Sequence, residues 1–221
     1  MPSARARIQR PSGAGTLAQT RAYAARAAAL AEQLRREVAE VPDRPHGRPA
    51  VVMLMGLPGV GKSHVARLLC ARLGAAHVAT DELRSRLFIA AAYTDAENRA
   101  VFATSQALVE VLLGEGHRVV VDATNLLAHN RAAVEELARR RAAPLVHVLV
   151  TAAEADVRTR LADRARSRAA EDHSDADERV YERMRDRAFE PPKEGHLEIA
   201  NGADLARDVA RVAEAVEATT R

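Results

Sequence analysis

Residues 50–63 read AVVMLMGLPGVGKS. The run at 50–55 is continuously apolar, which is typical of a strand that is buried on both faces of a parallel sheet. The pattern that follows, G-x4-G-K-S at 56–63, is typical of loops that hold phosphate groups. A helical run then continues to about Leu73 and ends at Gly74. The order of strand, loop and helix therefore predicts a site for a nucleoside triphosphate.

Each residue type in this loop suits a triphosphate. The glycines let backbone N–H groups converge on phosphate oxygens, and the first turn of the next helix adds partial positive charge. Lys62 is expected to bridge the β- and γ-phosphates, and the Ser63 hydroxyl to bind Mg²⁺. ATP and Mg²⁺ are therefore the expected cofactors. The predicted nucleotide contacts are Gly56, Leu57, Pro58, Gly59, Val60, Gly61, Lys62, Ser63, His64 and Asn125.

The use of lysine supports this interpretation of the loop. Of the 33 basic residues only two are lysine, Lys62 and Lys193. A chain that nearly always uses arginine thus has a compact, flexible ammonium at the one loop position that must reach a phosphate. An ordinary glycine-rich turn would not require that choice.

From residue 50 onward, apolar runs alternate with helical patterns. The alternation predicts a parallel sheet with helices on both faces. The expected fold class is α/β, a three-layer P-loop NTPase sandwich with a five-stranded parallel sheet and a helical lid. The expected strands are 50–55, 76–80, 117–122, 144–150 and 196–200.

Two regions of the chain differ in charge. Residues 1–49 carry nine arginines and four acidic residues, whereas residues 50–221 carry 24 basic and 26 acidic residues. The first region is expected to be an N-terminal extension, with a disordered start, an Ala-rich helix over 16–41 and a Pro- and Arg-rich linker over 42–49. The second, residues 50–221, is expected to be one P-loop domain with a lid at about 154–190. Because this body is nearly neutral, we expect no stable binding to duplex nucleic acid.

Apolar runs and cysteine content indicate the compartment. No apolar run approaches the roughly 20 residues that a membrane helix needs, so no membrane span is expected. The only cysteine, Cys70, lies in a helical run and is expected to pack in the core. A single cysteine excludes an intramolecular disulfide and fits a reducing compartment, so we expect a cytoplasmic location.

The second expected strand ends in TDELR (80–84). The carboxyl ends of parallel strands share one edge of the sheet, so Asp81 is expected beside the phosphate loop, where it can accept a hydroxyl proton. Arg84, one helical turn further, is expected to face the same way. The alternative is that Asp81 caps the helix and Arg84 is its solvated partner at i+3.

The third expected strand ends in VVVDATN (119–125). Asp122 is expected to hold Mg²⁺, directly or through water. Thr124 and Asn125 are expected to face the cleft. The alternative is that Asp122 only forms a turn.

The expected lid begins with an arginine-rich helix. Such a lid can close over the triphosphate, exclude water and neutralise charge as the phosphoryl group moves. Glu154, Asp156 and Asp163 are interleaved with the arginines, which alternatively indicates an exposed helix with paired charges. We expect one or two of the arginines to act on the phosphates; they are Arg158, Arg160, Arg164, Arg166 and Arg168.

Five segments of the chain together resemble the small P-loop kinases of the polynucleotide 5′-kinase type. They are GLPGVGKS, TDELR, DATN, RLADRARSR and DADERVYERMRDRAFEPP. This group includes many kinases of unknown acceptor, some of them labelled AAA-family ATP-binding proteins. The resemblance covers about residues 50–200. It implies that Asp81 is the general base and that Arg84 binds the acceptor phosphate. It also implies that Arg164 is the lid arginine, with Arg160 or Arg168 as alternatives.

We therefore expect an ATP- and Mg²⁺-dependent kinase that transfers the γ-phosphoryl group to an acceptor hydroxyl. The expected catalytic residues are Lys62, Asp81, Arg84 and Arg164, and the expected metal ligands are Ser63 and Asp122. The acceptor is expected to be a 5′-hydroxyl nucleic-acid end or a small molecule, although no basic channel with stacking aromatics is evident. Two alternatives stay open. One is a kinase of a sugar, an antibiotic or a nucleotide sugar, similar to zeta-type toxins; the other is a non-catalytic ATP-binding regulator whose N-terminal helix docks a partner.

Overall fold

Parallel strands form the centre of the molecule. The computed structural model describes residues 26–35, 41–45, 47–88, 93–167, 178–186 and 189–220. Within these residues five parallel strands form one sheet in the order β2-β3-β1-β4-β5, which confirms the expected fold class. The strands are β1 (Ala50–Met55), β2 (Ala75–Ala79), β3 (Arg118–Asp122), β4 (Leu145–Thr151) and β5 (Leu197–Ala200).

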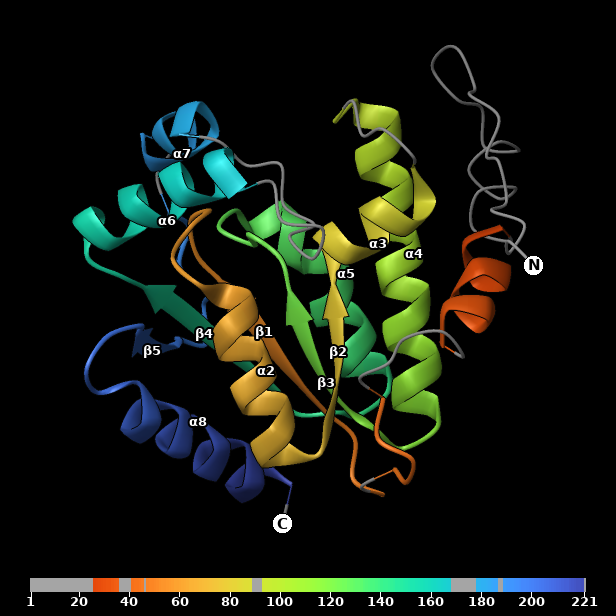
Figure 1. Cartoon of the computed structure of the whole chain (residues 1–221). Coiled ribbons are helices and arrows are strands. Elements are labelled where there is room, and N and C mark those ends of the chain that lie inside the picture. The colour runs from red at the N-terminus through yellow and green to blue at the C-terminus, as the bar shows by residue number, and fades with distance from the viewer. Residues whose placement is uncertain are drawn as a thin grey trace.

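Helices cover both faces of this sheet (Figure 1). On one face lie α2 (Lys62–Leu73) and α8 (Leu205–Thr219), and on the other lie α4 (Asp95–Gly114) and α5 (Ala128–Arg140). The short helix α3 (Thr80–Leu87) follows β2 directly. Two further helices, α6 (Glu154–Ser167) and α7 (Glu178–Arg185), lie beyond the carboxyl ends of the strands, where the lid was expected.

Strand β1 is the core of the sheet because its side chains alternate between two apolar clusters. Val52 and Leu54 belong to the cluster on the α2 and α8 face, and Val51 and Met53 belong to the cluster on the α4 face. All six residues of β1 are buried. The continuous apolar run in the sequence thus has the physical reason that was inferred for it: both faces of the strand are covered.

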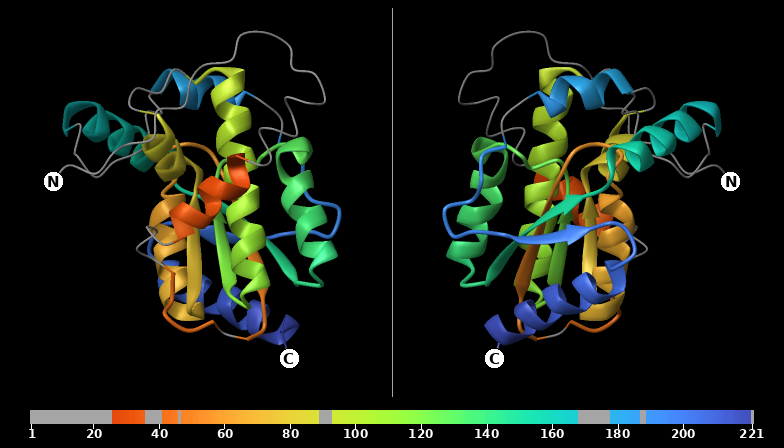
Figure 2. Two further views of the ribbon diagram at one scale, coloured as in Figure 1. Left: turned by 90° about the vertical axis from the view of Figure 1, so that its right-hand side faces the viewer. Right: turned by 90° about the vertical axis from the view of Figure 1, so that its left-hand side faces the viewer.

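Residues 26–35 form a helix that packs on the domain. Figure 2 shows it beside α4. Ala31 and Leu34 are buried in the α4-side cluster, and the Arg35 Nε lies 2.6 Å from a Glu115 carboxylate oxygen. The remainder of the helix expected over 16–41, and the start of the chain, lie outside the described residues.

Four of the five strands differ from the expected ranges by one residue at one or both ends, and the difference at Thr80 bears on the site. Thr80 was expected to end the second strand, but it begins α3. The pairing of β2 with β3 ends at Ala79 opposite Asp122, and the Thr80 hydroxyl donates a hydrogen bond to the Asp122 carbonyl at 3.3 Å. The chain therefore turns into a helix as soon as the strand ladder ends.

Among the described residues, no helix combines the length and apolar character that crossing a membrane requires.

Candidate active site

The phosphate loop, residues 56–61, connects β1 to α2, and its glycines are required by its geometry. Gly61 has a φ of 92°, and a Cβ atom there would overlap the side-chain amide of Asn201. Gly56 has a φ of 150°, and its Cβ would lie 2.5 Å from the Val150 carbonyl oxygen. Only glycine fits both positions without strain. The loop thus packs closely against the backbone of Val150 at Gly56 and against the side chain of Asn201 at Gly61.

Replacing Gly61 with alanine is expected to weaken ATP binding. The left-handed backbone conformation costs a side chain about 1–3 kcal/mol, and the Asn201 amide must also move. This energy corresponds to a loss of about 5- to 150-fold in ATP affinity, measured by titration calorimetry. Gly74→Ala is the matched control, because Gly74 also has a positive φ, 58°, but its Cβ would meet nothing within 4 Å. Equal ATP affinities in both variants would contradict this account.

Side chains from three elements hold the carbonyl groups of the loop. The Asn201 amide donates to the Val60 carbonyl at 2.8 Å, and Nη1 of Arg160 lies 3.3 Å from the same oxygen. Nζ of Lys62 donates to the Leu57 carbonyl at 2.9 Å. The loop path is therefore fixed by α6, by the turn after β5, and by its own lysine.

The expected metal ligands lie together below the loop. Asp122, at the end of β3, is 5% exposed, and its Oδ2 lies 3.3 Å from the His77 Nε2. Burial alone raises the pKa of Asp122, but the hydrogen bond with His77 and the charge of Lys62 outweigh it. A hydrogen bond from Ser63 acts in the same direction, so the pKa of Asp122 lies below its ordinary value. The site therefore favours an ionised carboxylate next to the loop serine.

This arrangement fits Mg²⁺. The ion prefers one or two protein oxygen ligands and completes its shell with phosphate oxygens and water. Ser63 and Asp122 supply such a pair. In the described part of the chain, no group of three or more His, Cys, Asp and Glu side chains forms a cage for a metal ion. A metal at this site would therefore be shared with the nucleotide.

Asn125 has a structural contact that the sequence did not predict. Its side-chain amide donates to the Leu54 carbonyl at 2.9 Å, and the residue is 5% exposed with a φ of 47°. Its own carbonyl accepts from Nη1 of Arg131 at 2.9 Å. Asn125 thus holds the end of β1 just before the phosphate loop. A contact between its side chain and the nucleotide stays a prediction.

Asp81 lies in the first turn of α3 and is half-buried. The preceding residue, Thr80, is hydrogen-bonded to the end of β3 at Asp122. Because β3 lies between β2 and β1, Asp81 follows the strand end next to the one that carries Asp122. The backbone therefore places Asp81 on the same sheet edge as the phosphate loop; its role as general base stays a prediction.

Arg84 is buried, with 6% of its surface exposed, so it is not the solvated partner of Asp81 that the alternative described. Its Nη2 donates to the Asn98 side-chain oxygen at 2.8 Å, and its guanidinium lies 4.4 Å from the centre of the Tyr93 ring. Among the described residues, its Nε and Nη1 have no hydrogen-bond partner. A buried cation with two unused donors is rare in proteins unless a ligand completes it.

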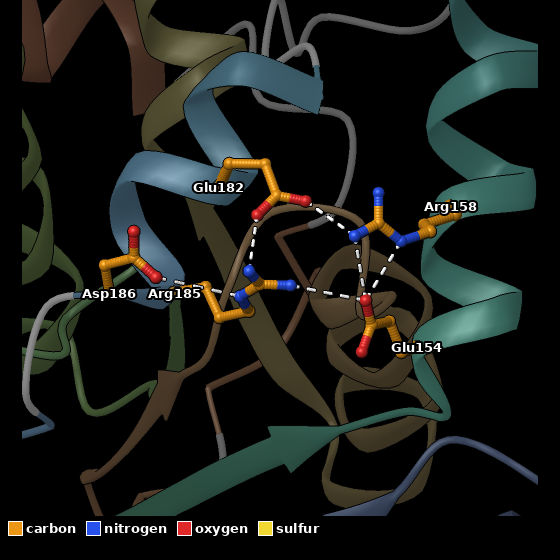
Figure 3. Close-up of polar contacts among 5 residues, drawn as sticks. All are labelled: Glu154, Arg158, Glu182, Arg185 and Asp186. Carbon is orange, nitrogen blue, oxygen red and sulfur yellow. Dashed lines mark hydrogen bonds and ion pairs between the residues drawn. The ribbon is translucent and has the colours of Figure 1, made fainter.

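The described arginines of α6 and α7 make different contacts. Figure 3 shows Arg158 and Arg185 between Glu154 and Glu182. Arg158 of α6 lies 2.6 Å from Glu182 of α7, and Arg185 of α7 lies 3.3 Å from Glu154 of α6. This network joins the two helices. Arg160 instead contacts the phosphate loop. The side chains of Arg164 and Arg166, and all of Arg168, lie outside the described residues.

The sequence profile of the AAA domain family matches residues 51–192, which include the loop, Asp81, Arg84, Asp122 and both lid helices. The chain belongs to this family. None of the curated proteins compared with the chain matches it. Several solved structures are similar to the AAA domain and show its fold.

Three solved structures illustrate the fold of this AAA domain. The Mycobacterium tuberculosis APS kinase CysC in complex with AMPPNP and APS is 22% identical, with a TM-score of 0.57 over 77% of this chain and 98% of that one. Chaetomium thermophilum Kti12 in complex with ADP-AlF3 is 21% identical, with a TM-score of 0.63 over 77% and 99%. A gluconokinase from Sinorhizobium meliloti 1021 is 18% identical, with a TM-score of 0.52 over 78% and 98%. The AAA domain thus has the fold of small P-loop kinases.

The contacts of two residues of this AAA domain site were not predicted from the sequence. Asn201 begins an Asn-Gly pair, for which a turn is the commoner explanation and a place near the nucleotide base the alternative, and its side chain holds the phosphate loop. His77 lies in the middle of β2 and contacts Asp122 from the neighbouring strand. The signal for Asn201 was its position after the last strand, on the sheet edge that carries the loop. His77 had no signal, because only the register of β2 with β3 brings it to Asp122.

Proposed function

We propose that the protein is an ATP- and Mg²⁺-dependent kinase that transfers the γ-phosphoryl group of ATP to an acceptor hydroxyl. The observation that carries the proposal is the cluster of Lys62, Ser63 and Asp122 below the loop, next to the strand end with Asp81 and Arg84. The fold relatives include an APS kinase solved with AMPPNP and APS and a gluconokinase, which supports a phosphotransferase.

Each residue has a distinct part in this reaction. The loop and Lys62 bind the phosphates, and the lysine stabilises the charge on the γ-phosphoryl group as it leaves. Mg²⁺, held by Ser63 and Asp122, would neutralise charge on the β- and γ-phosphates. Asp81 orients the acceptor hydroxyl and takes its proton as the oxygen bonds to the γ-phosphorus and the bond to the bridging oxygen breaks. A lid arginine, Arg164 by resemblance or Arg160 by its contact with the loop, adds positive charge.

Arg84 gives this site a preference for an acceptor with an anionic group. Asn98 and Tyr93 fix its guanidinium, and its Nε and Nη1 are the unpaired buried donors. A phosphate or carboxylate accepts a charge-assisted hydrogen bond from such a donor. We therefore place the anionic group of the acceptor at Arg84.

Replacing Arg84 with glutamine is expected to raise the KM for the acceptor. Each hydrogen bond to a charged group contributes about 1.5–3 kcal/mol, which corresponds to an increase in KM of about 10- to 150-fold. The control is Arg86→Gln, because Arg86 is exposed and pairs with Glu82 on the same helix. Steady-state kinetics with varied concentrations of the acceptor that the protein phosphorylates would measure this KM. An unchanged acceptor KM in Arg84→Gln would remove Arg84 from the acceptor site.

A panel of acceptors tests the proposed function. Radiolabelled ATP is incubated with the protein, Mg²⁺ and either 5′-hydroxyl oligonucleotides or a set of small hydroxylated metabolites, sugars, antibiotics and nucleotide sugars. Label transfer to the oligonucleotides would support the polynucleotide-kinase-like activity, and transfer to a metabolite would support a small-molecule kinase. A non-catalytic ATP-binding regulator predicts binding or hydrolysis of ATP with no labelled acceptor.

A further inference from the structure

An apolar pocket of about 450 Å³ opens beside the phosphate loop. Leu57 of the loop lines one wall, and Ala152, which follows β4, lines another. Helix α7 covers the pocket. Apart from Thr151, Tyr181 and Arg185, every side chain in its lining is apolar. The main apolar and aromatic contacts are Leu57, Leu126, Ala152, Tyr181, Met184 and Phe189. Both the volume and the apolar lining are typical of a site for a small organic molecule.

Hydrogen bonds hold the walls of this pocket in place. The buried Arg131 donates to the Glu190 carbonyl at 2.7 Å and to the Asn125 carbonyl at 2.9 Å. The Glu190 N–H also donates to the Leu126 carbonyl at 3.1 Å. These bonds fix Leu126 and the neighbouring Phe189 in one wall. The ion pairs between α6 and α7 fix the helix that carries Tyr181 and Met184 (Figure 3).

The pocket borders the part of the loop where the phosphoryl group is transferred. Leu57 lines the pocket, and its carbonyl accepts the hydrogen bond from the Lys62 ammonium. That lysine reaches the β- and γ-phosphates of a nucleotide in loops of this type. A molecule in the pocket would therefore lie beside the γ-phosphate, which is where an acceptor binds.

We propose that this pocket binds an apolar ring of the acceptor, so that the acceptor is an alcohol with an aromatic or hydrophobic ring and not a bare polyol. The inference rests on the proposed kinase function. Two strand spacings, about 10 Å, separate the β1 strand from the β2 strand that leads to Asp81. An acceptor that reaches both is therefore about as large as a nucleoside or a drug-sized molecule.

The test measures binding without phosphoryl transfer. Fluorine NMR follows 4-fluorobenzyl alcohol, a single aromatic ring with a hydroxyl, in the presence of saturating AMPPNP and Mg²⁺. The fluorine signal is expected to broaden saturably with the wild-type protein. The signal of 2-fluoro-2-deoxyglucose, a polar ring of similar size, is expected to stay sharp. Equal broadening of both signals would overturn the preference for an apolar ring.

Two variants fill the pocket from different walls. Met184 is half-buried on α7 and Ala152 is half-buried after β4, so Met184→Trp and Ala152→Phe are each expected to weaken binding of the fluorobenzyl alcohol at least about fivefold. Asp186→Trp is the matched control, because Asp186 follows α7, is exposed and lies outside the pocket lining. Circular dichroism shows which variants are folded, and either folded pocket variant decides the result.

The outcomes separate this inference from the proposed function. Undiminished binding in a folded pocket variant would overturn the inference. Broadening that is seen without AMPPNP and lost when AMPPNP is added would also overturn it and would assign the pocket to the nucleotide base. Phosphorylation of polar acceptors alone, with no binding of the fluorobenzyl alcohol, would overturn the inference and leave the kinase function standing. Binding of the alcohol in the pocket without any kinase product would leave a site for an apolar ring, but it would overturn the kinase function and with it the role of the pocket in binding an acceptor.

Discussion

Replacing Asp81 with asparagine is expected to lower the kcat of phosphoryl transfer by about 100- to 10,000-fold, the usual contribution of a general base. Asparagine keeps the size of the side chain but cannot take the proton of the acceptor hydroxyl. The nucleotide contacts come from the loop between β1 and α2, whereas Asp81 is in α3, so ATP affinity is expected to stay as in the wild type. Single-turnover kinetics and a binding titration with ATP measure the two quantities separately.

The matched control for this variant is Glu82→Gln. Glu82 is the next residue of the same helix turn, and its carboxylate pairs with the exposed Arg86. The same loss of one negative charge should therefore leave kcat near its wild-type value. If Asp81→Asn kept wild-type transfer, or lost ATP binding, Asp81 would not be the general base.

Replacing Lys62 with methionine is expected to lower kcat/KM by about 100- to 1,000-fold, as for the loss of one donor that stabilises transition-state charge. Methionine retains the apolar stem but has no ammonium to follow the γ-phosphoryl group. The variant also loses the hydrogen bond from the Lys62 ammonium to the Leu57 carbonyl, which helps to fix the path of the loop. Steady-state kinetics with ATP and the acceptor measure the effect.

The chain provides its own control for this variant. Lys193 is the only other lysine in the sequence, and it is exposed. Lys193→Met removes the same charge from the molecule and is expected to leave kcat/KM unchanged. Comparable losses in both variants would mean that net charge, and not the position of Lys62, determines the rate.

The sequence was sufficient for the sheet and for the loop. Apolar runs at the right spacing predicted each strand, because the interior of a strand covered on both faces is mostly apolar. The boundary at Thr80 was wrong, because strand length depends on where the partner strand ends and not on local preference. The glycine pattern predicted the loop, and the structure supplies the reason in the close contacts at Gly56 and Gly61.

Tertiary contacts explain what the sequence did not indicate. A solvated Arg84 and a buried one have the same local pattern, and only the packing of Tyr93 and Asn98 distinguishes them. Asn201 lies 141 residues from the carbonyl of Val60 that it holds. The apolar pocket likewise combines the loop with segments from β4, α7 and beyond, so no single stretch of sequence describes it.

In the proposed reaction, this site passes a phosphoryl group from ATP to an alcohol. The most direct measurement incubates the protein with a cell extract, Mg²⁺ and ATP labelled with ¹⁸O at the γ-phosphoryl group, and identifies labelled products by mass spectrometry. The account predicts a labelled phosphate ester of an extract metabolite or nucleic-acid end that is formed by the wild type and absent with Asp81→Asn. Label in inorganic phosphate alone, at equal rates for both proteins, would contradict it.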